Sequence, residues 1–202
     1  TSSSIARDSG RSSRFGSAAV ASLERELDRS PVRDIERVNA LLIRAKDACW
    51  SIERDRLRTA VAVTDLAGAT GSDAGLAVYL STQQALSALD RLEVRGRDSA
   101  GLHLLVFDHG LDTSSPGVVA ELERRSGDML FQNRSVRGGD GWLSFVYKEA
   151  AEIGELGDNT RAIRTAIRDD ELLRRALSAP AVHAVVLGHT RWASVGIISE
   201  PN

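Results

Sequence analysis

Residues 92–107 read LEVRGRDSAGLHLLVF, a polar turn that leads directly into an apolar run. The run over 102–107 has the length and composition of a buried strand, and glycine bounds it on the N-terminal side. Gly96 permits a left-handed turn, and Gly101 permits close approach of another backbone, because neither residue carries a β-carbon. The segment therefore predicts a junction between a helix and a buried strand.

The polar part of this junction has two interpretations. Arg95 and Asp98 could present a guanidinium and a carboxylate side by side at the mouth of the strand, as a binding site requires. A helix C-terminal cap with a structural ion pair has the same composition. The residues alone leave both interpretations open.

A second segment, residues 182–196, reads VHAVVLGHTRWASVG. Its first part, 182–187, is apolar on both faces and predicts a strand of a sheet that is covered on both sides. Beyond that strand, Arg191 can hold a carboxylate with two parallel hydrogen bonds, and Trp192 can wall an adjacent pocket. The alternative is a core tryptophan beside a surface arginine.

Helical periodicity marks most of the remaining chain. It predicts helices over 18–28, 31–60, 73–92 and 159–176, and glycines 138, 139 and 141 predict the loop of a β-hairpin over 129–147. The first sixteen residues are rich in serine and glycine and predict a disordered tail. The expected domains are a tail over 1–16, a helical insertion over 17–75 and a partial α+β domain over 76–202.

Composition excludes several classes of protein. With 26 Lys and Arg against 28 Asp and Glu, the net charge of -2 argues against a nucleic-acid partner. No apolar run approaches the length of a membrane span. The single cysteine, Cys49, rules out an intrachain disulfide and a thiolate metal cluster, and a reducing cytoplasm suits it. The four histidines lack metal-ligand spacing, so no metal is expected, and His103 is expected to pack in the core.

The two segments together resemble a known family. Arg95-Gly96-x-Asp98-Ser99-Ala100-Gly101, followed by Gly188-His189-Thr190-Arg191-Trp192-Ala193 and later Ser199-Glu200-Pro201-Asn202, is similar to the glutaminase domain of class II glutamine amidotransferases. Within that family it most resembles the glutamine:fructose-6-phosphate aminotransferase branch. The likeness covers roughly residues 76–202, and the preceding helices look like an insertion.

This resemblance implies an N-terminal-nucleophile (Ntn) hydrolase fold, which is a four-layer αββα sandwich. The implied reaction is hydrolysis of the side-chain amide of L-glutamine, with ammonia passed to a synthase/isomerase domain or partner chain that aminates an acceptor such as a sugar phosphate. The family needs no cofactor for this step. In that family an N-terminal cysteine attacks the amide, its own α-amino group acts as base, and an Asn-Gly pair forms the oxyanion hole.

The resemblance also assigns roles to residues. Arg191 would hold the α-carboxylate of glutamine, Trp192 and Ser194 would line the pocket, and Arg95 would support the neighbourhood of the nucleophile. The remaining motif positions would set the local structure, and they are Gly96, Asp98, Ser99, Gly101, His189 and Thr190.

The chain departs from the family pattern at several positions. It starts with Thr1 in a serine-rich stretch, where the family has cysteine, and Cys49 lies on the apolar stripe of a helix, as an inert buried thiol does. Arg97 and Val195 also differ from common family residues. Because Asn202 precedes the expected oxyanion-hole segment, these residues are expected to be one segment of a larger amidotransferase.

A second function class competes with this one. In it, the helical region over 17–66 packs against partner subunits, including a homo-oligomer, and the glutaminase-like part is a non-catalytic scaffold. Such a protein would be an interaction or regulatory module.

Overall fold

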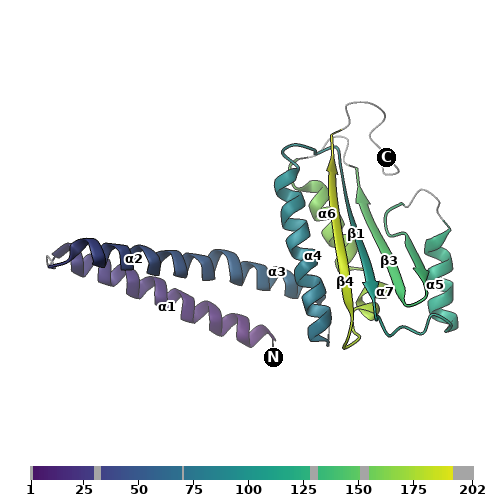
Figure 1. Cartoon of the computed structure of the whole chain (residues 1–202), viewed down its shortest axis with the longest axis horizontal. Coiled ribbons are helices and arrows are strands. Elements are labelled where there is room, and N and C mark those ends of the chain that lie inside the picture. Colours follow the sequence, from purple (N-terminus) through teal and green to yellow (C-terminus); the bar gives the residue numbers. More distant parts are fainter. Residues whose placement is uncertain (1, 30–32, 70, 128–131, 151–154, 193–202) are drawn as a thin grey trace. The chain divides into compact units, whose positions relative to one another are not determined.

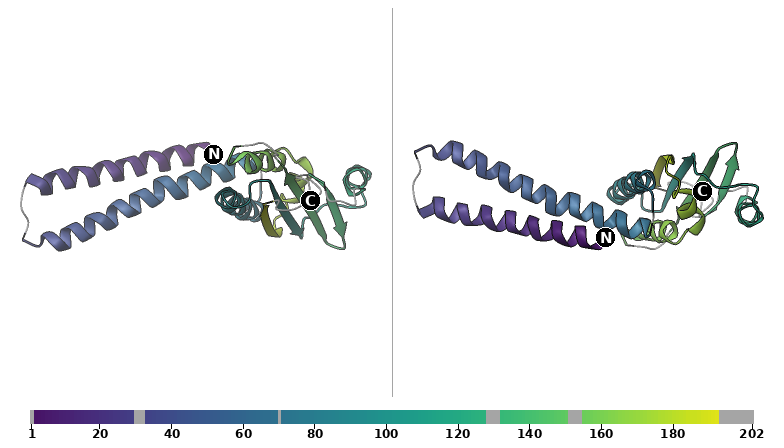
Figure 2. Two further views of the ribbon diagram at one scale, coloured as in Figure 1. Left: turned by 90° about the horizontal axis from the view of Figure 1, so that it is seen from above. Right: turned by 90° about the horizontal axis from the view of Figure 1, so that it is seen from below.

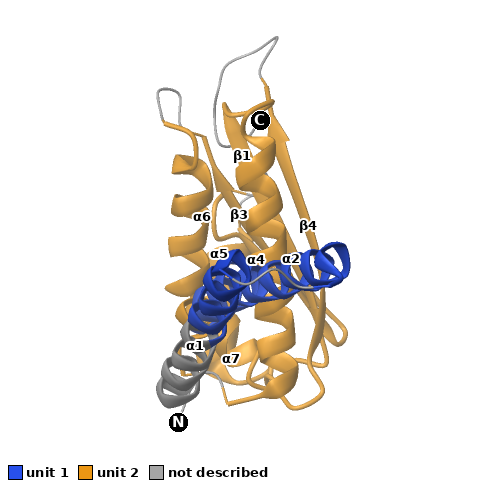
Figure 3. Cartoon of the chain, turned by 90° about the vertical axis from the view of Figure 1, so that its left-hand side faces the viewer, with its two compact units in different colours: residues 1–64 blue, residues 65–202 orange. Residues whose placement is uncertain are grey.

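The structure, a computed structural model, describes residues 2–29, 33–69, 71–127, 132–150 and 155–192, with side chains from Gly16 onward. The chain divides into two compact units, residues 1–64 and 65–202 (Figure 3). The boundary lies before residue 75, where the sequence predicts the end of a helical insertion. No helix in the described ranges has both the length and the apolar character that a bilayer span requires.

The first unit is a helical hairpin. Helix α1 (Ser2–Arg29) and helix α2 (Ile35–Trp50) run side by side in the two views of Figure 2. Helix α2 continues through a π-helical segment, η1 (Ser51–Arg56), into helix α3 (Leu57–Ala67), as the long apolar stripe predicts. Where the sequence predicts a disordered tail over 1–16, helix α1 already begins at Ser2.

Helix α2 begins later than predicted. Its N-cap is Asp34, whose carboxylate accepts a hydrogen bond from the backbone N–H of Arg37. The predicted start at residues 30 and 31 lies outside the described residues. A carboxylate at this position satisfies one of the free N–H groups of the first helical turn.

The second unit is a mixed α+β domain with one four-stranded antiparallel sheet (Figure 1). The strand order is β2-β3-β1-β4, so β4 is an edge strand. The elements follow in the order α4 (Asp73–Leu92), β1 (Ser99–Phe107), α5 (Pro116–Ser126), β2 (Val136–Gly139), β3 (Trp142–Glu149), α6 (Asp158–Arg168), α7 (Glu171–Ala176) and β4 (His183–Arg191).

The core lies between one face of this sheet and the helices. On that face Leu102, Leu104 and Val106 of β1 are at most 1% exposed. Helices α4 and α6 pack there. Gly188 allows α4 to come close to β4, because a β-carbon at this position would lie 3.2 Å from Cδ2 of Leu89. The covered face thus forms the hydrophobic core that holds the sheet in place.

The opposite face of the sheet carries apolar side chains with no helix over them in the described residues. Val185 and Leu187 of β4 are exposed for 49% and 60%. The strand predicted over 182–187 forms as part of β4, but among the described residues helices cover only one of its two faces. An apolar run indicates that a face can be buried, but it does not show which layer buries it.

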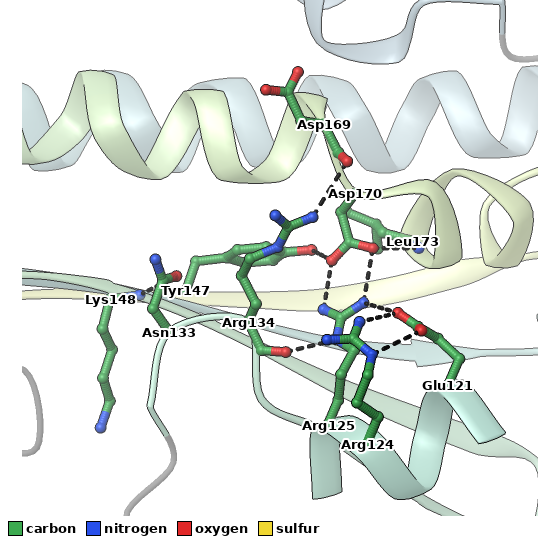
Figure 4. Close-up of polar contacts among 10 residues, drawn as sticks. All are labelled: Glu121, Arg124, Arg125, Asn133, Arg134, Tyr147, Lys148, Asp169, Asp170 and Leu173. Atoms are coloured by element: carbon green, nitrogen blue, oxygen red, sulfur yellow. Dashed lines mark hydrogen bonds and ion pairs between the residues drawn. The ribbon is translucent and has the colours of Figure 1, made fainter. Parts of the chain in front are cut away.

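A buried ion pair braces the second unit (Figure 4). Arg125 of α5 donates two hydrogen bonds to Asp170, the N-cap of α7, at 2.9 and 2.5 Å. The hydroxyl of Tyr147 on β3 donates to the same carboxylate at 2.8 Å. Burial raises the pKa of Asp170, but hydrogen bonds from Arg125 and its positive charge outweigh burial and hold that pKa below its ordinary value. The network ties α5, α7 and β3 together.

Candidate functional site

The two polar segments meet at one end of the sheet. Strands β1 and β4 pair antiparallel, and in this register Ser99 lies opposite Arg191 and Gly101 lies opposite His189. The backbone N–H of Asp98 donates to the carbonyl oxygen of Arg191 at 3.1 Å. Residues about ninety positions apart in the sequence are therefore cross-strand neighbours.

Two glycines permit this close approach. A β-carbon at Gly101 would lie 2.5 Å from Cε1 of the His189 ring, so any other residue there would require the ring to turn away. A β-carbon at Gly96 would lie 3.1 Å from the carbonyl carbon of Arg191. At Gly101 a side-chain ring comes close rather than the predicted backbone; the close backbone neighbour, Arg191, is at Gly96. The predicted left-handed turn at Gly96 is wrong, because its φ is not positive and its role is to make room for Arg191.

Ser99 and Arg191 form the centre of the candidate site. Side chains of directly opposed residues in an antiparallel pair project from the same face of a sheet, which here is the open face. The side chain of Arg191 is half-buried. Ser99 is only 5% exposed, and its hydroxyl has no hydrogen-bond partner in the described part of the chain. A buried hydroxyl without a partner is costly unless a ligand satisfies it.

Two hollows lie near this pair and are lined by its neighbours in the chain rather than by Ser99 or Arg191. A cavity of about 370 Å³ is lined by Gly96 and Asp98 of the turn and by Trp192 after β4. Trp192 is 70% exposed and forms the outer wall of this cavity. A groove of about 510 Å³ runs along the open face and is lined by Gly101, His103, Lys148, Leu187 and His189, among others.

The other predicted site residues are placed as follows. Arg95 and His189 are exposed, and Asp98 and Thr190 are half-buried. Ser194 lies outside the described residues, as does Thr1. Cys49 is half-buried in the helical hairpin, and its sulfur would lie 3.4 Å from a β-carbon at Gly16.

Glu93 is a positioning residue that sequence reasoning missed. Its side chain is 1% exposed and accepts hydrogen bonds from the backbone N–H of Gly157 and of Thr160, the latter at 3.1 Å. Asn159 donates to the carbonyl oxygen of Arg97 at 2.7 Å. Residues 159 and 160, predicted to begin the last long helix as caps, lie inside its first turn, and Gly157 is the N-cap. The start of α6 therefore braces the polar turn.

A second polar pair lies on the open face. His103 Nε2 and Ser144 Oγ are 2.7 Å apart across β1 and β3. Burial lowers the pKa of His103, so the ring is neutral near pH 7. The predicted core position of His103 is wrong, because its side chain faces the open side of the sheet beside the groove. These two residues are 41 positions apart in the sequence, and the pairing of β1 with β3 brings them together.

Comparison with known proteins adds nothing to this description. No family model, no curated protein and no solved structure matches this chain. The candidate site therefore rests on its geometry and chemistry.

The arrangement suits recognition of a small anion. A guanidinium binds a carboxylate with two parallel hydrogen bonds, and the adjacent serine hydroxyl can donate a third. Within the described ranges no group of three or more His, Cys, Asp or Glu side chains is placed to hold a metal ion. The described residues thus form a candidate anion-binding site where β1 begins and β4 ends.

Proposed function

We propose that the chain is part of a glutamine-dependent amidotransferase and that the sheet end formed by β1 and β4 binds L-glutamine. Hydrolysis of the glutamine amide would release ammonia for a synthase/isomerase domain or a partner chain, with an acceptor such as a sugar phosphate. The observation that carries this proposal is the pairing of Ser99 with Arg191, because the resemblance requires its two motifs to meet at one site.

The chemistry of the pair supports the same substrate class. Arg191 is half-buried and lies opposite Ser99, and the carboxylate of a free amino acid can accept hydrogen bonds from a guanidinium and from a hydroxyl. Trp192 and the turn at 96–98 enclose a cavity next to them. A cavity of this size can hold a molecule as small as glutamine.

The open face of the sheet supports the finer fold assignment, an Ntn hydrolase sandwich. Val185 and Leu187 are apolar and exposed there, while the opposite face is closed by helices. Sheets with two apolar faces are stable when a second layer covers each of them. In the proposed αββα arrangement a second sheet covers this face and completes the glutamine site.

The decisive experiment measures glutamine-dependent ammonia release by the natural full-length polypeptide that contains these residues. Because the ion pair with the α-carboxylate is lost, Arg191→Ala should lower kcat/KM about 100-fold, mainly through KM. Arg175→Ala removes an exposed arginine of α7 and serves as the matched control, with unchanged kinetics expected. Normal activity of the R191A variant would contradict the site assignment.

Binding to residues 1–202 tests the recognition step apart from catalysis. Titration with L-glutamine should shift the backbone amide NMR signals of Ser99 and Arg191. Glutamine methyl ester, which lacks the α-carboxylate, should shift them far less at the same concentration. Equal signal shifts with both ligands would show that Arg191 does not bind the α-carboxylate.

A further inference from the structure

The described side chains of the helical hairpin bury little surface. Among the described side chains of α1 and α2, none is buried. Two helices alone provide one shared seam, and small scaffolds of this kind gain stability through association or another staple. The apolar surface that remains exposed on the hairpin therefore indicates a further interface.

Helix α2 carries two apolar seams. The inner seam, which is half-buried and faces α1, consists of Val38, Leu42, Ala45 and Cys49. The outer seam repeats this spacing three positions later and shares Ala45 with the inner seam; it consists of Leu41, Ala45, Ala48 and, in η1, Ile52. Leu41 and Ile52 are exposed for 56% and 43%. A helix with two heptad seams is typical of a bundle with more than two helices.

The outer seam is complementary to itself when one copy is reversed. The order large, small, small, large is the same from either end, so Leu41 would face Ile52 and Ala45 would face Ala48 of an antiparallel copy. The two small residues at the centre let the backbones approach closely. A two-fold interface requires such self-complementarity, because each surface must pack against an identical one.

We infer that the partner of the outer seam is a second copy of this chain, and that the two hairpins form an antiparallel four-helix bundle. The available area agrees with this. A face two helices wide and 22 residues long, from Ile35 to Arg56, covers roughly 20 Å by 33 Å at about 10 Å per helix and 1.5 Å per residue. Two such faces bury roughly 1,300 Å², within the range of stable dimers.

The opposite side of α2 is less suited to this interface. Ile43 and Trp50 are exposed there, for 59% and 65%, but Lys46 lies between them in sequence and forms an ion pair with Glu24 of α1. Burying that charged pair would require its desolvation. The outer seam has no charged residue between Leu41 and Ile52 at its heptad positions.

The test measures the molar mass of residues 1–202 in solution by light scattering and sedimentation. The unaltered chain should be a dimer. Leu41→Glu and Ile52→Glu should each weaken the dimer about 100-fold, because each places two carboxylates in the apolar seam. Ile43→Glu, on the opposite side of the same helix, is the matched control and should leave the dimer intact. Circular dichroism checks that each variant keeps its helices.

A charge-pair rescue separates this arrangement from a general loss of structure. In the double variant L41E/I52K the new opposite charges lie about 16 Å apart within one helix, too far to pair, but face each other across the antiparallel dimer. Recovery of the dimer by this variant is expected. A monomeric unaltered chain, dissociation by I43E rather than L41E, or no rescue would each overturn the inference.

Discussion

The two faces of the sheet carry different kinds of residue. On the face beneath α4 and α6, Leu104 and Val106 are fully buried. On the open face Leu187 is exposed for 60%, and the polar side chains of Ser99 and Arg191 project from the same side. The contrast shows that the helices of this domain cover one face, whereas no helix in the described residues covers the other.

The largest effect is expected on the covered side, at the buried ion pair. Asp170→Ala leaves the guanidinium of Arg125 buried without its carboxylate, and should lower the free energy of unfolding by about 3–5 kcal/mol. Urea denaturation at pH 7 measures this loss. Asp169→Asn, at the exposed neighbouring residue, should change the free energy by less than about 0.5 kcal/mol. Similar losses in both variants would argue against the network as a brace.

Apolar truncation compares the two faces directly. Leu104→Ala should cost about 3 kcal/mol in this chain, because it opens a cavity in the packed core. Leu187→Ala should cost less than about 1 kcal/mol, since that side chain is mostly exposed. Thermal unfolding of both variants distinguishes the faces. A much larger cost for L187A in the natural full-length polypeptide would be the signature of the proposed second sheet.

Glycine substitutions probe the end of the open face. Gly96→Ala places a β-carbon against the backbone of Arg191 and should cost about 1–2 kcal/mol of unfolding free energy. Gly101→Ala meets the ring of His189, an exposed side chain that can turn away, so its cost should be smaller. Chemical denaturation measures which of the two variants loses more unfolding free energy. The reverse order would show that the histidine ring is held more firmly than the strand backbone.

The smallest effect concerns the pH response of the open face. Burial lowers the pKa of His103, so the neutral ring is favoured in the folded chain. Its contribution to stability is complete above the unfolded pKa of about 6.5 and declines as the pH falls toward the lower folded value. NMR titration of the ring protons should give a pKa below 6.5. A value above 6.5 would contradict the neutral pairing with Ser144.

Local patterns predicted most of the helices. The period of apolar residues over 73–92 matches α4 (Asp73–Leu92). A hairpin forms within the predicted range, but its first strand begins at Val136, and Gly138 and Gly139 lie in that strand rather than in the loop. Strand β4 extends to Arg191 rather than ending near Leu187, because pairing with β1 continues through the polar residues. The pattern of side chains does not show how far backbone pairing extends, so the predicted strand ended too early.

The candidate site was predicted in part. Both segments were recognised from their residue types, and the structure brings Gly101 and His189 together. Glu93, the residue that fixes the turn to α6, was missed because its partners Gly157 and Thr160 lie more than sixty positions away. A buried carboxylate that binds a distant helix start has no local signature.

The amino-acid sequence determined the helical periods, the short apolar strands and the glycines, because these depend on neighbours within a few residues. The folded chain decided which residues became partners. It placed Ser99 opposite Arg191, covered only one side of the sheet with helices, and paired Arg125 with Asp170. Register and burial arise from packing between segments far apart in the chain, so they are settled only when the whole domain folds.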